Sequence, residues 1–141
     1  MQNILHAETW ACSKAPGLDV IEAIARDAFT RLPEVFQVAC KNVVFLVTEC
    51  PDADVVDEME LESPFDILGL FTGFGLASMG TGPETGQMPN TIHLYRRPIL
   101  DYWAEHDETL EHVVAHVLIH EIGHQLGLSD EQLGTIEACG T

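Results

Sequence analysis

Basic residues are scarce in this chain of 141 residues, which has 6 Lys and Arg against 23 Asp and Glu and a formal net charge of −17. Affinity for nucleic acid depends largely on cationic side chains that neutralise phosphates. The composition therefore argues against nucleic acid and anionic membrane surfaces as partners. The same excess of negative charge favours cations, including divalent metals, although an acidic surface is most often simply a solvated one.

Long apolar runs are missing as well. No segment reaches the roughly 18 apolar residues that a membrane-spanning helix needs, and glycines interrupt the longest weakly polar segment, 67–79. The first fifteen residues contain no basic region followed by an apolar run, so we expect no cleaved secretion signal. These absences favour a cytoplasmic protein that does not interact with membranes.

Paired cysteines are the third absence. The chain has four cysteines: Cys12, Cys40, Cys50 and Cys139. None belongs to a CxxC pair, so we expect free thiols rather than a disulfide framework or a cysteine zinc site.

The chain does have enough apolar residues for a core. Its hydrophobic content is 46%, which is typical of a folded globular protein. A chain of this length buries roughly 68–70% of its extended surface without disulfide or metal staples. The sequence contains no internal repeat and no low-complexity linker, so we expect one soluble domain over residues 1–141.

The segment 107–126 is the strongest predicted helix. Its apolar stripe comprises Leu110, Val113, Val114, Val117, Leu118 and Ile122. Asp107 is the expected N-cap and Gly127 the expected stop. After this stop, Ser129 and Gln132 match a capping box that opens a last short helix.

Shorter elements surround this helix. Helical spacing and proline positions predict helices at 19–31, 33–40 and from Arg96 through Trp103. Apolar and β-branched runs predict strands at 42–49, 68–73 and 91–95, the first buried on both sides. The acidic segment 52–62 is expected to be an exposed loop with a short helix, and 75–90 a long loop bordering a cleft. This order of elements predicts an α+β fold with a small mixed sheet of three or four strands packed against helix 107–126.

Within the strongest helix lies His120-Glu121-Ile122-Gly123-His124, an HExxH motif. Two histidines four residues apart share one helical face, so both imidazoles can reach one zinc ion. Glu121 is then placed to contact a metal-bound water and to act as general base. Histidine and glutamate in an apolar-striped helix would otherwise be awkward core residues.

The motif continues as Gln125-Leu126-Gly127-Leu128-Ser129-Asp130, which completes HExxHxxGxxD. Gly127 can adopt the left-handed conformation that ends a helix and turns the chain sharply. The turn is expected to bring Asp130 towards the two histidines as a third zinc ligand. Two alternatives remain: Asp130 only starts the last helix, or Glu137 is the third ligand.

The extended motif resembles the small bacterial zincin-like metallopeptidase domains that bear HExxHxxGxxD and whose substrates are largely unassigned. The segments Asp66–Gly73 and Pro89–Leu100 are similar to that family's glycine-bounded segment and to its strand before the active-site helix. The resemblance covers roughly residues 32–137. It implies a minimal zincin-like fold with a zinc cofactor. One departure is Asn90, which stands where an aspartate is expected.

Other polar residues near the motif have two interpretations. His112 and His116 continue the four-residue spacing, but His116 and His124 are separated by eight residues, about 12 Å of helix rise. His116 is therefore expected to be a hydrogen-bonding neighbour rather than a third ligand on the same ion. A second set of residues also has two possible roles: His93, Tyr95, Arg96 and Arg97. Any of them could stabilise an oxyanion. Alternatively, Tyr95 only packs in the core and the two arginines form ion pairs with the acidic surface.

The sequence thus favours a zinc-dependent peptidase or amide hydrolase with Glu121 as general base and His120, His124 and Asp130 as ligands. The alternative is a non-catalytic metal-binding interaction domain. Because so small a chain lacks a second lobe, we expect a shallow, exposed groove for a short or extended peptide or protein substrate.

Overall fold

The computed structural model describes residues 2–73 and 90–140, with side chains described for 7–73 and 90–137. Three strands form the central sheet in the order β1-β3-β2: β1 Val44–Thr48, β3 Thr91–Tyr95 and β2 Gly69–Thr72. β1 runs parallel to β3 and β2 antiparallel to it. The predicted α+β fold with a small mixed sheet is confirmed.

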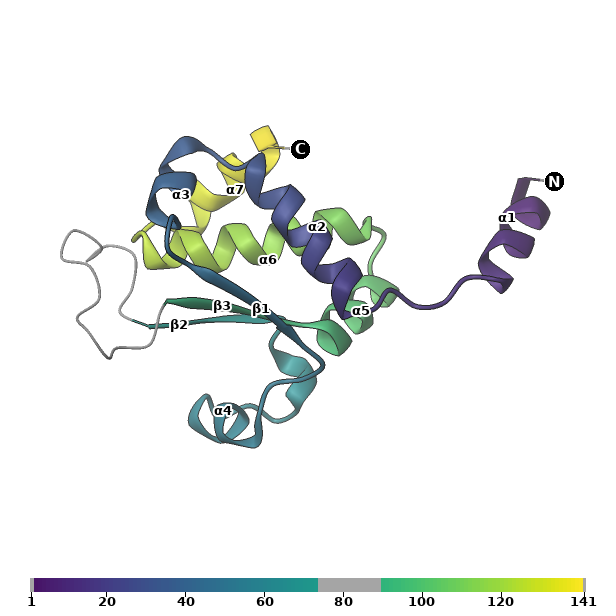
Figure 1. The fold of residues 1–141 in the computed structure, drawn as a ribbon, viewed down its shortest axis with the longest axis horizontal. Helices are drawn as coiled ribbons and strands as arrows, with labels where there is room; N and C mark the ends of the chain where they lie inside the picture. The colour runs from purple at the N-terminus through teal and green to yellow at the C-terminus, as the bar shows by residue number, and fades with distance from the viewer. Residues whose placement is uncertain (1, 74–89, 141) are drawn as a thin grey trace.

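Helices surround this sheet. They are α1 Gln2–Ala11, α2 Leu18–Thr30, α3 Glu34–Ala39, α4 Ala53–Glu58, η1 Pro64–Asp66, α5 Arg96–Glu105, α6 Leu110–Gln125 and α7 Asp130–Gly140. In Figure 1, α2 and α6 lie above the sheet, α4 lies below it, and α1 stands apart from the other elements. No helix in the described part of the chain is both long and apolar enough to cross a membrane. The helix α1 was not predicted from the sequence.

The prediction that strand 42–49 is buried on both sides is wrong. Val44 and Leu46 in β1 are 46% and 45% exposed, whereas Phe45 is buried. Phe45 packs edge-on against Phe29 of α2, with ring centroids 5.4 Å apart. β1 is an edge strand that α2 covers on one face, so alternate side chains point to the uncovered face.

The N-cap of the strongest helix was also predicted wrongly. α6 begins at Leu110, and the Thr109 side chain, not Asp107, accepts a hydrogen bond from the backbone N–H of His112. Both residue types are good N-caps. Leu110 and Val113 are buried, so the first turn of α6 starts where its apolar stripe enters the core.

The contact between α6 and β2 aligns the helix on the sheet. A Cβ at Gly69 of β2 would lie 2.6 Å from the Cγ1 of Val117, so only glycine permits this approach. Glu121 lies one helical turn beyond Val117, and Phe71 lies two residues beyond Gly69. These steps advance about 6 Å along a helix and about 6.7 Å along a strand. The close approach at Gly69 therefore favours a meeting of Glu121 with the backbone at Phe71.

Candidate metal centre

The HExxH motif occupies the C-terminal turns of α6, as predicted. The rings of His120 and His124 lie next to each other, with centroids 5.8 Å apart. Ile122, on the opposite face, is fully buried in the core. The burial of the apolar stripe thus turns both imidazoles away from the core towards α7.

The turn after α6 has the predicted left-handed glycine. Gly127 has φ +81. Its N–H donates to the carbonyl of His124 at 3.1 Å, and the N–H of Leu128 donates to the carbonyl of Gly123 at 3.0 Å. This pair of bonds is a Schellman motif, in which a left-handed residue satisfies the last helical carbonyls. The chain therefore reverses direction directly after His124.

α7 begins with the predicted capping box. The N–H of Ser129 donates to the Gln132 side chain at 2.8 Å, and the N–H of Gln132 donates to Oγ of Ser129 at 3.2 Å. Asp130 is consequently the first residue of α7. Its Oδ1 also lies 2.9 Å from Nε2 of His124. Asp130 thus starts the helix and contacts the histidine at the same time.

One possible metal-binding group combines His120, His124 and Asp130, whose candidate ligand atoms all lie within 4.8 Å of one another. The hydrogen bond and the charge of His124 hold the pKa of the Asp130 carboxyl below its ordinary value. An ionised carboxylate and two imidazoles are ligands that zinc commonly takes in catalytic sites. The donor set therefore fits zinc.

Glu121 points to the sheet rather than to α7. Its Oε2 accepts a hydrogen bond from the backbone N–H of Phe71 at 3.2 Å. β2 has a neighbouring strand on one side only, so the other side of its backbone is available for such a contact. Burial raises the pKa of the Glu121 carboxyl, although the hydrogen bond from Phe71 and the charge of His124 act in the opposite direction. A carboxyl with a raised pKa is typical of general acids and bases.

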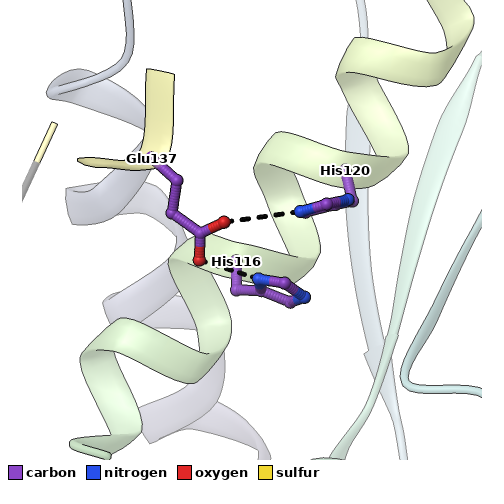
Figure 2. A group of neighbouring side chains, drawn as sticks. All are labelled: His116, His120 and Glu137. Atoms are coloured by element: carbon purple, nitrogen blue, oxygen red, sulfur yellow. Dashed lines mark hydrogen bonds and ion pairs between the residues drawn. The ribbon is translucent and has the colours of Figure 1, made fainter. Parts of the chain in front are cut away.

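A second possible metal-binding group lies one turn earlier on α6. Glu137 of α7 points between His116 and His120, as Figure 2 shows. Its Oε1 lies 2.7 Å from Nδ1 of His116, and its Oε2 lies 3.4 Å from Nε2 of His120. Partial burial raises the pKa of the Glu137 carboxyl, but the hydrogen bonds and charges of the two histidines outweigh this effect and lower it.

Three contacts near this site were not predicted from the sequence. The first is the bond from Phe71 to Glu121, which joins residues 50 positions apart. The second is the single carboxylate of Glu137 placed against two histidines. The third is His112, whose Nδ1 lies 2.9 Å from Glu108 and whose Nε2 lies 3.8 Å from Glu137. The sequence did indicate Glu137 as an alternative ligand and His116 as a hydrogen-bonding neighbour, and these two residues are hydrogen-bonded to each other.

The candidate oxyanion stabilisers are engaged in other contacts. Arg96 donates to the backbone carbonyl of Pro16 at 2.6 Å and to Glu49 at 3.0 Å. Nε of Arg97 lies 3.9 Å from the same Glu49 carboxylate. Both arginines thus form ion pairs with Glu49, as expected if they pair with acidic surface residues rather than stabilise an oxyanion.

The other two candidates lie on β3. Tyr95 is buried, and burial, followed by the charges of Asp52 and Glu121, raises the pKa of its phenol. Nε2 of His93 lies 3.1 Å from Oγ1 of Thr72. Burial lowers the pKa of His93, while the charge of Asp52 acts against this shift.

Two sequence-based expectations fall partly outside the described residues. Cys12, Cys40 and Cys50 are free thiols, as predicted, whereas the side chain of Cys139 lies outside the described part. Of the loop expected at 75–90, only Asn90 is described, and it belongs to no helix or strand.

Comparison with known proteins identifies the family. No curated protein matches the chain. A family model described as zincin-like metallopeptidase matches residues 40–139, which include all of the sheet, the HExxH motif and most of α7. Proteins of this family generally bind zinc, which indicates a zinc-dependent metallopeptidase. The match covers well over half of the sequence, and the chain therefore belongs to the zincin-like metallopeptidase family.

Proposed function

We propose that this protein is a zinc-dependent peptidase whose ion is held by His120, His124 and Asp130. The observation that carries the proposal is the convergence of these three donors within 4.8 Å of one another. The partly buried Glu121 directly follows His120 in the chain, and its carboxyl experiences the charge of His124. Zinc bound by three protein ligands lowers the pKa of a coordinated water to about 7 and polarises the scissile carbonyl. The chain's own residues supply the proton transfer.

Glu121 is the proposed general base. Burial raises the pKa of its carboxyl above the ordinary value. A general base is most effective when its pKa lies near the pH at which the enzyme works, because it must both accept and return a proton. The N–H of Phe71 holds Oε2, so that one carboxylate oxygen is positioned while the other is available. Glu121 accepts a proton from the attacking water and later donates it to the leaving amine.

The exposure of the ligands favours a polymeric substrate. The side chains of His124 and Asp130 are 51% and 86% exposed, so the proposed site opens directly onto the surface. An extended peptide can reach such a site without entering a deep pocket. We therefore propose a short or extended peptide, or an exposed segment of a protein, as the substrate.

Zinc binding and hydrolysis measured on two variants test the proposal. Glu121→Gln keeps the size of the side chain and an oxygen for the bond from Phe71, so it should bind zinc like the wild type. Hydrolysis of a fluorogenic peptide library should fall roughly a hundred- to ten-thousand-fold, because general base catalysis is lost. His124→Ala removes a ligand of the proposed catalytic ion and should therefore lose activity, and a chelator should abolish wild-type activity.

Each variant has a result that would contradict the proposal. Undiminished hydrolysis by Glu121→Gln would exclude this residue as the base. Tight zinc binding by the wild type without hydrolysis of any library member would favour a metal-binding interaction domain instead. Undiminished hydrolysis by His124→Ala would exclude the proposed ligand set.

A further inference from the structure

We propose that His116, His120 and Glu137 form a second zinc-binding site, which overlaps the first at His120 and holds the ion in an alternative position. This inference rests on the proposed function, because it concerns the same histidine. Nothing in the match to the family model assigns His116 or Glu137. The candidate ligand atoms of these three residues lie within 4.8 Å of one another, as do those of the first group.

The orientation of Glu137 supports a ligand role. Its two carboxylate oxygens point to different histidines, one to His116 at 2.7 Å and the other to His120 at 3.4 Å (Figure 2). The rings of the two histidines have centroids 4.2 Å apart. One carboxylate thus contacts two imidazoles that belong to successive turns of α6.

The chemistry of the donors specifies the ion. Two imidazoles and one carboxylate suit zinc and similar divalent transition metals. The Glu137 side chain is only 17% exposed, so its carboxylate is held between the two histidines rather than free in solvent. The net charge of the chain, −17, adds a general attraction for cations.

The geometry also separates the two sites. His116 and His124 are eight residues apart on one helix, about 12 Å of rise, so no single ion can bind both. His120 lies midway and belongs to both groups. An ion that takes His120 together with His116 and Glu137 therefore leaves His124 and Asp130. The wild-type chain should bind one zinc ion, distributed between the two positions.

The experiment is a zinc titration by calorimetry on metal-free protein. Two double variants each remove one site and keep His120: His124→Ala with Asp130→Ala, and His116→Ala with Glu137→Gln. A quadruple variant combines them. The matched control is His106→Ala, since His106 lies at the end of α5, where it stacks on Tyr102.

We expect one zinc ion per chain in the wild type, in the control and in each double variant, and none in the quadruple variant. Circular dichroism of the metal-free proteins monitors folding. If His116→Ala fails to fold, Glu137→Gln alone replaces it, because this change keeps the size of the side chain while removing the charge. The single variant should then also reduce zinc binding when it is combined with His124→Ala and Asp130→Ala.

Several results would overturn the inference, and they differ from failure of the proposed function. Loss of all zinc from the His124/Asp130 double variant would exclude the second site and leave the first intact. Two ions in the wild type would exclude the sharing of His120, and retained binding in the quadruple variant would exclude both groups. Wild-type affinity in the His124/Asp130 variant, with none in the His116/Glu137 variant, would instead refute the proposed catalytic ligands and leave the second site as the only one.

Discussion

Gly123→Ala should destabilise the protein through the packing of α7 on α6. A Cβ at this position would lie 2.0 Å from Cδ2, 3.2 Å from Cγ and 3.3 Å from Cδ1 of Leu133. Leu133 is fully buried in α7, so it cannot swing into solvent. Overpacking of a well-packed core costs about 1–3 kcal/mol. Alanine also favours a helix over glycine by about 0.8–1.0 kcal/mol, which offsets part of this cost.

Gly134→Ala provides a matched control. Gly134 lies in α7, one residue after Leu133, and an added Cβ would meet nothing within 4 Å. Both substitutions gain the helical preference of alanine, so the difference between their free energies of unfolding isolates the packing cost. We expect Gly134→Ala to stabilise the protein by up to about 1 kcal/mol. The free energy of unfolding of Gly123→Ala should be about 1–3 kcal/mol lower than that of Gly134→Ala.

Urea denaturation of metal-free protein measures these free energies, and zinc titration provides a second readout. α7 carries Asp130 and Glu137, so displacement of α7 should also weaken zinc binding in Gly123→Ala but not in Gly134→Ala. In a Leu133→Ala background, where the clashing atoms are gone, Gly123→Ala should no longer be destabilising. Equal stability of the two glycine variants in the wild-type background would refute the packing argument.

Three further predictions concern the helix ends and a buried thiol. Thr109→Ala removes the bond to the N–H of His112 and should lower the free energy of unfolding by about 0.5–2 kcal/mol in urea denaturation. Gly127→Ala forces a side chain into a left-handed conformation with φ +81 and should cost about 1–2 kcal/mol by the same measurement. Burial raises the pKa of the Cys40 thiol from 9.0 to about 11, so the unfolded chain loses this proton first as the pH rises. The free energy of unfolding should therefore fall between these two pH values, by at most about 1.4 kcal/mol per pH unit, and an equally steep fall in Cys40→Ala would contradict this cause.

The local features of the site follow from the sequence because they depend on residues three or four positions apart. The spacing of His120 and His124 and the left-handed turn at Gly127 are of this kind. So is the capping box of Ser129 and Gln132. Each was predicted correctly, since helical geometry alone fixes which neighbours meet. The order of helices and strands along the chain likewise predicted a small mixed sheet beside α6.

Two local features were predicted wrongly, because more than one structure was compatible with the same short segment of sequence. Asp107 and Thr109 are both suitable N-caps, and the start of the buried stripe at Leu110 decided between them. The apolar run of β1 predicted burial on both faces. Val44 and Leu46 are exposed because only one face of this edge strand is covered, which depends on the number of helices that pack there.

Contacts over long sequence distances were decided by tertiary structure alone. Glu121 meets Phe71 across 50 positions because Gly69 lets β2 approach α6 closely. Glu137 meets His116 across 21 positions because α7 packs back along α6 where Gly123 accommodates Leu133. No periodicity links such residues. The sequence by itself determined that His120 and His124 share one face of α6, because helical spacing is a local property. Only tertiary packing decided that Asp130 and Glu137 of α7 face these histidines and that Glu121 meets the backbone of β2.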